Sequence, residues 1–449
     1  MGIFNNKIEL DENNPFKEDK LNRIEEVKIL TSLFEAVENQ MVLAIDSPWG
    51  TGKTTFLKMW NKYLKGYGYQ TVYFNCWKND FVEDPFIAFI EEFREQLDSS
   101  LVSKDFREKA SDVGKYLIKN IPGVLIKGIK DKTGIDVNEI ISEDDLESLV
   151  QSKMDDYSKT KNSVEKFKEE LKNLSDKNIK DTEKPLVVFV DELDRCRPDF
   201  AISLLERIKH FLNVENIIFV LGIDKDALSN SIKIVYGNGT DIEGYLTRFI
   251  DLEYRLSQKY NDEYVKKIIE KYNFKEIFNK SNPKHYEYFV QSCSEVIKVF
   301  CFSLRDIEKF ISKVYLIMKT NTTIHEIYEL VVFLEALNKF NKKLYYKLKN
   351  KEINVSELIS TISTDLDIES WFNDMESLGV YTEAYLIYIM KDVDRITYKE
   401  SRISKESNQN IYNNIDARCI DFHNDLKKRI FTSDLHSYIF DRIDLYKNY

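Results

Sequence analysis

A short stretch near the N-terminus has the residue types and spacing to bind phosphate. It consists of Ser47, Pro48, Trp49, Gly50, Thr51, Gly52, Lys53, Thr54 and Thr55. Gly50 and Gly52 allow a tight turn, so that successive backbone N–H groups can point at phosphate oxygens. Lys53 would reach the terminal phosphates, and the hydroxyl of Thr54 would bind Mg²⁺. Ser47 departs from the usual pattern G-x-x-x-x-G-K-[ST], which has glycine at this position.

Acidic residues follow two apolar runs later in the chain. Asp191 and Glu192 follow residues 186–190, and Asp224 comes shortly after residues 217–221. Asp191 could complete the Mg²⁺ shell, and Glu192 is placed to polarise a water toward the γ-phosphate as general base. A helix cap is the structural alternative for this pair. Asp224 could sense the γ-phosphate or the attacking water, or cap the next helix, and both roles can coexist.

Two arginines flank Cys196 just past the acidic pair. A cation near the developing charge assists phosphoryl transfer, and it often comes from an adjacent subunit. Arg195 and Arg197 are therefore candidates for this role. Local ion pairs with Asp194 or Asp199 are the alternative.

These side chains need a frame of buried strands with helices between them. Five segments are predicted to be strands: 41–45, 71–75, 186–190, 217–221 and 250–256. Helical spacing is found in residues 21–40, before the first strand, and in segments between the strands. This alternation indicates a doubly wound α/β domain with a parallel sheet. Arg23, at the start of the first helix, could touch a base or phosphate, or could be a solvated helix-start arginine.

The α/β pattern has an insertion and a helical continuation. Residues 103–180 form the insertion, in which Val150, Tyr157, Val164 and Leu171 recur every seven residues. This fits a coiled-coil-like arm or a long surface helix packed on the domain. Helical patterns continue almost unbroken beyond residue 257. We therefore predict a polar segment over 1–20, an α/β domain over 21–257 and a helical region over 258–449.

Composition limits the classes of function. The 449 residues include 65 basic and 76 acidic side chains, and the net charge of −11 argues against broad binding to nucleic acid or anionic membranes. Residues 342–351 interleave lysine and tyrosine, as single-strand binders can, although a solvated helix face is the preferred interpretation. The scattered cysteines and the lack of an apolar leader or of a run near ~20 apolar residues favour a cytoplasmic protein without a transmembrane segment. No zinc site is predicted.

Six segments carry a resemblance to a known family. They are DSPWGTGKTTFLKMW at 46–60, YFNCWKNDFVEDP at 73–85, VVFVDELDRCRPDFAISLLERIKHFL at 187–212, FVLGIDKDAL at 219–228, GYLTRFIDLEYRL at 244–256 and SLRDIEKFI at 303–311. With these segments the chain resembles the KAP family of P-loop NTPases. The resemblance implies an ASCE-type ATPase core with strand order 5-1-4-3-2, ATP and Mg²⁺ as ligands, and the catalytic glutamate at Glu192. It also implies that Arg305 acts like a sensor-2 arginine toward the γ-phosphate; the alternative is an exposed arginine at the start of a helix. Arg248 is a weaker candidate for reaching the nucleotide across subunits.

The resemblance also suggests a biological role. Many family members carry transmembrane helices where this chain has the polar segment 103–180, and bacterial members are associated with phage exclusion. We therefore expect an ATP-hydrolysing switch, with anti-phage defence as the role that kinship suggests. A homo-oligomer or a protein partner would use the insertion or the C-terminal helices. The alternatives are an ATP-stabilised scaffold with negligible turnover and, less favoured, a nucleic-acid-directed ATPase.

Overall fold

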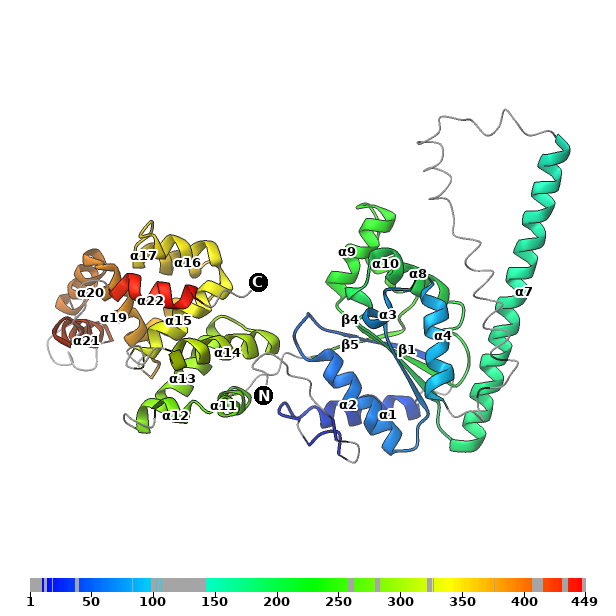
Figure 1. The fold of residues 1–449 in the computed structure, drawn as a ribbon, viewed down its shortest axis with the longest axis horizontal. Helices are drawn as coiled ribbons and strands as arrows, with labels where there is room; N and C mark the ends of the chain where they lie inside the picture. Colours follow the sequence, from blue (N-terminus) through cyan, green and yellow to red (C-terminus); the bar gives the residue numbers. More distant parts are fainter. Residues whose placement is uncertain are drawn as a thin grey trace. The chain divides into compact units, whose positions relative to one another are not determined.

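The computed structural model divides into two compact units, Ile8–Ser257 and Gln258–Tyr449 (Figure 1). Each unit is considered by itself below. The structure describes residues 10–11, 14–17, 19–36, 40–82, 84–97, 102, 106, 143–256, 262–278, 283–320, 325, 327–374, 376–405, 415–429 and 435–445.

A parallel sheet forms the centre of the first unit. Its strands are β1 (Met41–Asp46), β2 (Thr71–Asn75), β3 (Leu186–Asp191), β4 (Ile217–Ile223) and β5 (Leu252–Arg255). Every pairing is parallel, and the order is β2-β3-β4-β1-β5, which is 5-1-4-3-2 when read from the other edge. All residues of β3 and β4 are buried, as expected for unbroken apolar runs in a parallel sheet covered on both faces. The predicted α/β fold with a parallel sheet is therefore confirmed.

Helices cover both faces of this sheet (Figure 1). They are α1 (Ile24–Ala36), α2 (Lys53–Gly66), α3 (Cys76–Asn79), α4 (Pro85–Gln96), α7 (Glu143–Thr182), α8 (Pro198–Ile208), α9 (Lys225–Tyr236) and α10 (Ile242–Leu246). Alternate residues of β1 serve two cores: Leu43 packs with Trp60 of α2, whereas Val42 belongs to the core that contains Phe86 of α4. The two cores fix α2, which follows the phosphate-binding stretch, against one face of the sheet.

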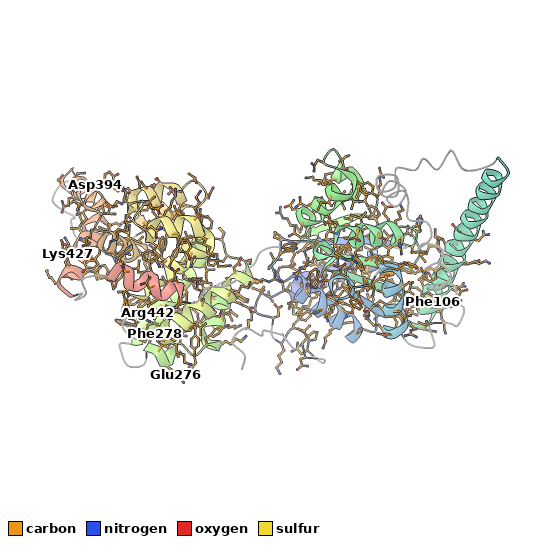
Figure 2. The ribbon with its side chains drawn as sticks, turned by 45° about the horizontal axis from the view of Figure 1, so that its top comes forward. Phe106, Glu276, Phe278, Asp394, Lys427 and Arg442 are labelled. Carbon is orange, nitrogen blue, oxygen red and sulfur yellow. The ribbon has the colours of Figure 1, made fainter. Side chains whose placement is uncertain are left out.

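The C-terminal half of α7 packs against the first unit. Phe167, Leu171 and Leu174 are buried, and the Phe167 ring lies 5.1 Å from Phe211 and 5.1 Å from Phe106. Figure 2 marks Phe106 beside this helix. The packed surface helix is thus the alternative that holds for this half. The side chains of Val150 and Tyr157, which defined the coiled-coil-like arm, lie outside the described residues, as do residues 107–142.

Strand β2 lies at one edge of the sheet, where a side chain satisfies part of its backbone. The N–H of Tyr73 donates to Oε1 of Gln96 at 2.8 Å, and Nε2 of Gln96 donates to the Tyr73 carbonyl at 2.9 Å. The amide of Gln96, from the end of α4, takes the place that a neighbouring strand would occupy at this residue.

The described residues of the second unit are helical, which confirms the predicted helical C-terminal region. Its helices are α11 (Asp262–Lys271), α12 (Lys275–Phe278), α13 (Pro283–Val299), α14 (Leu304–Thr320), α15 (Tyr328–Phe340), α16 (Lys342–Lys349), α17 (Val355–Ile362), α18 (Ile368–Asn373), α19 (Gly379–Met390), α20 (Val393–Lys405), α21 (Ile415–Arg429) and α22 (Leu435–Asp444). Helix α15 is buried along most of its length and is the central helix of this unit. Among the helices that the structure describes, none combines the length and apolar character needed to cross a membrane.

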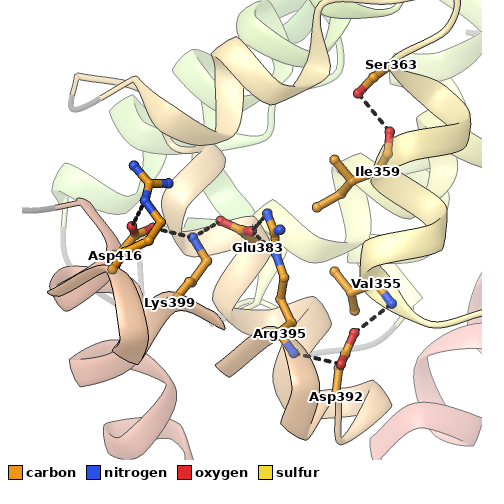
Figure 3. Close-up of polar contacts among 9 residues, drawn as sticks. Val355, Ile359, Ser363, Glu383, Asp392, Arg395, Lys399 and Asp416 are labelled. Atoms are coloured by element: carbon orange, nitrogen blue, oxygen red, sulfur yellow. Dashed lines mark hydrogen bonds and ion pairs between the residues drawn. The ribbon is translucent and has the colours of Figure 1, made fainter. Parts of the chain in front are cut away.

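Buried charges connect three helices of the second unit (Figure 3). Lys399 of α20 places Nζ 2.9 Å from Oε2 of Glu383 on α19 and 2.8 Å from Oδ1 of Asp416 on α21. Arg395 adds a 2.6 Å contact from Nη2 to Oε1 of Glu383. Because Glu383 and Lys399 are almost completely buried, removing one partner would leave an uncompensated charge in the core.

Helix α16 contains the interleaved lysines and tyrosines. Tyr345 is fully buried, with its ring 5.3 Å from Phe440, and Lys349 pairs with Asp444 at 2.6 Å. Lys342 and Lys343 are exposed. The pattern is therefore that of a helix packed through its apolar side, with lysines on the solvent side.

Candidate functional site

The phosphate-binding stretch connects β1 to α2, which is the predicted strand–loop–helix arrangement. Gly50 and Gly52 have φ of 87° and 90°, a region that strains any residue with a side chain. Gly52 precedes the first turn of α2 and has no side chain to cap it. The N–H groups that open this helix therefore remain available to an anion, and the helix dipole favours negative charge there.

Ser47 closes this loop from the inside. Its side chain is fully buried, and its Oγ lies 2.5 Å from Oγ1 of Thr51, which donates to the Pro48 carbonyl at 2.9 Å. Ser47 is not among the positive-φ residues in the part of the chain that the structure describes. The position therefore does not need a glycine conformation, and the hydroxyl contributes a hydrogen bond that glycine would lack.

Lys53 is buried inside the loop. Its Nζ donates to the Ser47 carbonyl at 2.8 Å. Burial lowers the pKa of Lys53, an effect that the nearby carboxylates Asp194 and Asp224 oppose. A phosphate group at this point would supply a direct counter-charge to the ammonium group.

Asp191 ends β3 as a buried carboxylate. Its Oδ2 accepts a 2.5 Å hydrogen bond from the Tyr73 hydroxyl, and its Oδ1 accepts from the N–H of Glu192 at 2.8 Å. Burial raises the pKa of Asp191 to about 6. Gly222 on the adjacent strand leaves it room, because a Cβ there would lie 2.9 Å from Oδ1 of Asp191 and 2.3 Å from Cδ1 of Leu57.

Glu192 follows in a left-handed backbone conformation, with φ of 60°. Its Oε1 lies 3.2 Å from the donating hydroxyl of Thr54 and 2.9 Å from Nη1 of Arg195. Its Oε2 accepts from Nδ2 of Asn75 at 2.8 Å. The sequence predicts that Thr54 and Glu192 belong to one site, and in the structure their side chains are in contact.

Asp224, which follows β4, connects the phosphate-binding loop to the start of α9. Its Oδ1 accepts from the N–H of Ala227 at 3.1 Å, which makes it the N-cap of α9, and its Oδ2 accepts from the N–H of Trp49 at 3.1 Å. The indole N–H of Trp49 donates to Asp194, a buried carboxylate whose pKa is raised by desolvation. The predicted cap is therefore present, and the same carboxylate also contacts the loop.

The arginines after the acidic pair both have local partners, although not all of the expected ones. Arg195 pairs with Glu192 rather than with Asp194. Arg197 places Nε 3.0 Å from Oδ1 of Asp80 and Nη1 3.8 Å from Asp199. Asp80, which follows α3, was not predicted as a partner, because its proximity depends on how β2 and β3 pair.

Three other predicted arginines occupy different environments. Arg23 is buried and pairs with Glu26 at 3.1 Å, so the prediction of a solvated helix-start arginine is wrong. Its proximity to a base or phosphate stays a prediction. Arg248 is exposed in the turn after α10. Arg305 is exposed at the start of α14 and belongs to the second unit, so its sensor role stays a prediction.

The residues gathered here fit a nucleotide with Mg²⁺. Oxygen ligands suit Mg²⁺, and the Thr54 hydroxyl and the Asp191 carboxylate supply two at the start of α2 and the end of β3. The buried ammonium group of Lys53 and the open N-terminus of α2 suit a polyphosphate. Sequence reasoning gave no role to Tyr73 and Asn75, although both lie within the motif at 73–85 and two residues apart on one strand.

A parallel sheet with a phosphate-binding loop after β1 and an acidic pair after β3 defines a P-loop NTPase. The profile of the KAP family P-loop domain matches residues 23–321, about two thirds of the chain. The chain belongs to the KAP family of P-loop NTPases. No curated protein matches the chain.

Proposed function

We propose that the protein binds ATP with Mg²⁺, hydrolyses it, and uses the nucleotide state as a switch. The observation that carries this proposal is the 3.2 Å contact between Oγ1 of Thr54 and Oε1 of Glu192. It puts the expected metal ligand next to the expected general base, at the carboxyl end of the parallel sheet, where ligands of α/β proteins bind.

Each side chain has a role in this reaction. The backbone of the Gly50–Gly52 turn and the start of α2 would hold the phosphates, with Lys53 at the terminal ones. Thr54 and Asp191 would hold Mg²⁺, which neutralises developing negative charge. Glu192 would accept a proton from the attacking water, and Asp224 would orient that water from the end of β4.

The switch would act on a partner protein or on further copies of this chain. The insertion over 103–180 and the C-terminal helices are the surfaces that we propose for this contact. A role in anti-phage defence rests on kinship alone. Arg305 is retained as a sensor of the γ-phosphate on the same basis.

Nucleotide binding is tested first with Lys53→Ala. We expect this variant to lose measurable MgATP binding by isothermal titration calorimetry, because it removes the buried ammonium group from the loop. Lys58→Ala is the matched control, since Lys58 lies on the exposed side of the same helix. Unchanged affinity in Lys53→Ala would contradict the site. Titrating GTP in parallel determines the base preference.

Hydrolysis is tested with Glu192→Gln. We expect phosphate release to fall by about 10²-fold or more, the usual contribution of a general base, while MgATP affinity is retained. If wild type and Glu192→Gln both release phosphate at background rates, the ATP-stabilised scaffold is the better description. The contacts that occupy Glu192 in this structure are the observation that favours the scaffold.

A further inference from the structure

The carboxylate of Glu192 is held by three donors from three elements. Thr54 of α2 and Arg195 share Oε1, and Asn75 of β2 donates to Oε2. A base that takes a proton from water needs a carboxylate oxygen directed at that water. Here both oxygens are directed at protein donors.

We propose that Asn75 and Arg195 form a clamp that holds Glu192 in a resting position, and that release of Asn75 limits the rate of ATP hydrolysis. This inference rests on the proposed function, because it concerns the control of the same glutamate. It makes Asn75 a positioning residue for the reaction.

The amide of Asn75 is fixed at both of its ends. Its Oδ1 accepts from the N–H of Lys78 at 2.9 Å and so caps α3, which directs Nδ2 at Oε2 of Glu192, 2.8 Å away. The side chain is nearly buried, and Asn75 pairs with Asp191 in the register of β2 and β3. The pairing of β2 with β3 therefore places the Asn75 amide next to Asp191 and Glu192.

Arg195 holds the other carboxylate oxygen, Oε1. Its guanidinium reaches back across the 3₁₀ turn Leu193–Arg195 to Glu192, and the pair is largely shielded from water. The left-handed backbone at Glu192 needs such support, because a residue with a side chain stays in that region only when its surroundings hold it there. Removing donors from the carboxylate would let Glu192 move.

The segment after Asn75 provides a route for control. Asn79 donates from Nδ2 to the Asn75 carbonyl at 3.0 Å, and Asp80 holds Arg197. Two aromatic side chains of the same segment, Trp77 and Phe81, are exposed, Phe81 to 82%. A change in the conformation of this segment would move the Asn75 amide and so alter the contact with Glu192.

The decisive variant is Asn75→Asp. It keeps an oxygen that can accept from the N–H of Lys78 and replaces the donor to Glu192 with an oxygen that repels it. We expect kcat for MgATP to rise about fivefold with KM unchanged, because one hydrogen bond contributes on the order of 1 kcal/mol and about 1.4 kcal/mol is a factor of ten. Lys78→Ala is the matched control, since the exposed Lys78 contacts Asn75 through its backbone N–H, which the variant keeps, and its kcat should equal that of wild type.

Two further measurements make the result decisive. Adding Glu192→Gln to Asn75→Asp should abolish the rise in kcat. That result would show that the effect of Asn75→Asp on kcat depends on Glu192. Asn75→Ala serves if Asn75→Asp fails to fold, as judged by thermal unfolding. Unchanged or lower kcat in a folded Asn75 variant overturns the clamp, even when Lys53→Ala and Glu192→Gln behave as the proposed function requires. Failure of those two variants instead overturns the proposed function itself.

Discussion

Ser47 shows how a departure from the usual loop pattern is accommodated. Its φ is not positive, and its hydroxyl lies 2.5 Å from that of Thr51, inside the phosphate-binding loop. Glycine at this position would remove the hydrogen bond and add backbone freedom in the unfolded state. The serine therefore stabilises the loop rather than straining it.

We predict that Ser47→Gly weakens MgATP binding several-fold and lowers the thermal unfolding midpoint. The loss combines one hydrogen bond, ~1 kcal/mol, with a backbone entropy term of ~0.5–1 kcal/mol. Calorimetry and thermal unfolding measure the two effects, and Ser47→Ala separates them because it removes the hydroxyl alone. Tighter binding by Ser47→Gly would mean that the usual glycine is preferred after all.

The sequence predicts the residues of the site better than their contacts. Lys53, Thr54, Asp191 and Glu192 could be found because their spacing from apolar runs is local information. Asn75 could not, since it meets Glu192 across 117 residues of chain through the pairing of β2 with β3. Such a contact depends on register, which no single segment specifies.

At the scale of elements, helix α15 contains a buried carboxyl group, that of Glu329. Glu329 is nearly buried, and its Oε2 has no hydrogen-bond partner among the described residues. Burial raises the pKa of Glu329 from 4.5 to about 7. The folded state therefore binds a proton that the unfolded chain releases, and stability from this group is lost as pH rises from 4.5 to 7.

We predict that Glu329→Gln stabilises the protein at pH 8 and has little effect at pH 4.5. Above pH 7 the gain in free energy of unfolding should be on the order of 3 kcal/mol, since each pKa unit is worth about 1.4 kcal/mol. Denaturant unfolding of wild type and variant across this range measures it. Glu369→Gln is the control, because Glu369 is exposed on α18. A difference that does not depend on pH would show that folding does not raise the pKa of Glu329.

Element types were more predictable than element partners. The apolar runs gave the strands because a doubly covered parallel sheet buries every residue of its central members. The seven-residue spacing in α7 left two alternatives, because periodicity shows which side of a helix is apolar and not what covers it. Phe167 settles this for the described half by packing against Phe86 and Phe211.

At the scale of the whole molecule, Arg248 is the candidate for action between subunits. Arg195 and Arg197 are engaged by Glu192 and Asp80, whereas Arg248 is exposed in the turn that follows α10. We predict that MgATP raises the mass of the Glu192→Gln protein in light scattering, because this variant would retain bound nucleotide.

A mixing experiment tests the arginine itself. Arg248→Ala and Lys53→Ala should each be inactive alone, and a mixture should regain phosphate release, since a subunit that cannot bind ATP can still supply Arg248 to its neighbour. If the mixture stays inactive although MgATP drives assembly, Arg248 does not act across the interface.

The amide of Gln96 also limits how copies of this protein can join. An exposed strand edge is a template on which another chain can continue the sheet, and it is a frequent start of domain swapping and fibre growth. At Tyr73 both backbone groups of that edge are already bound to Gln96. Another strand could extend the sheet past β2 at Tyr73 only by displacing this side chain, so Gln96 opposes growth of the sheet at this residue of the edge.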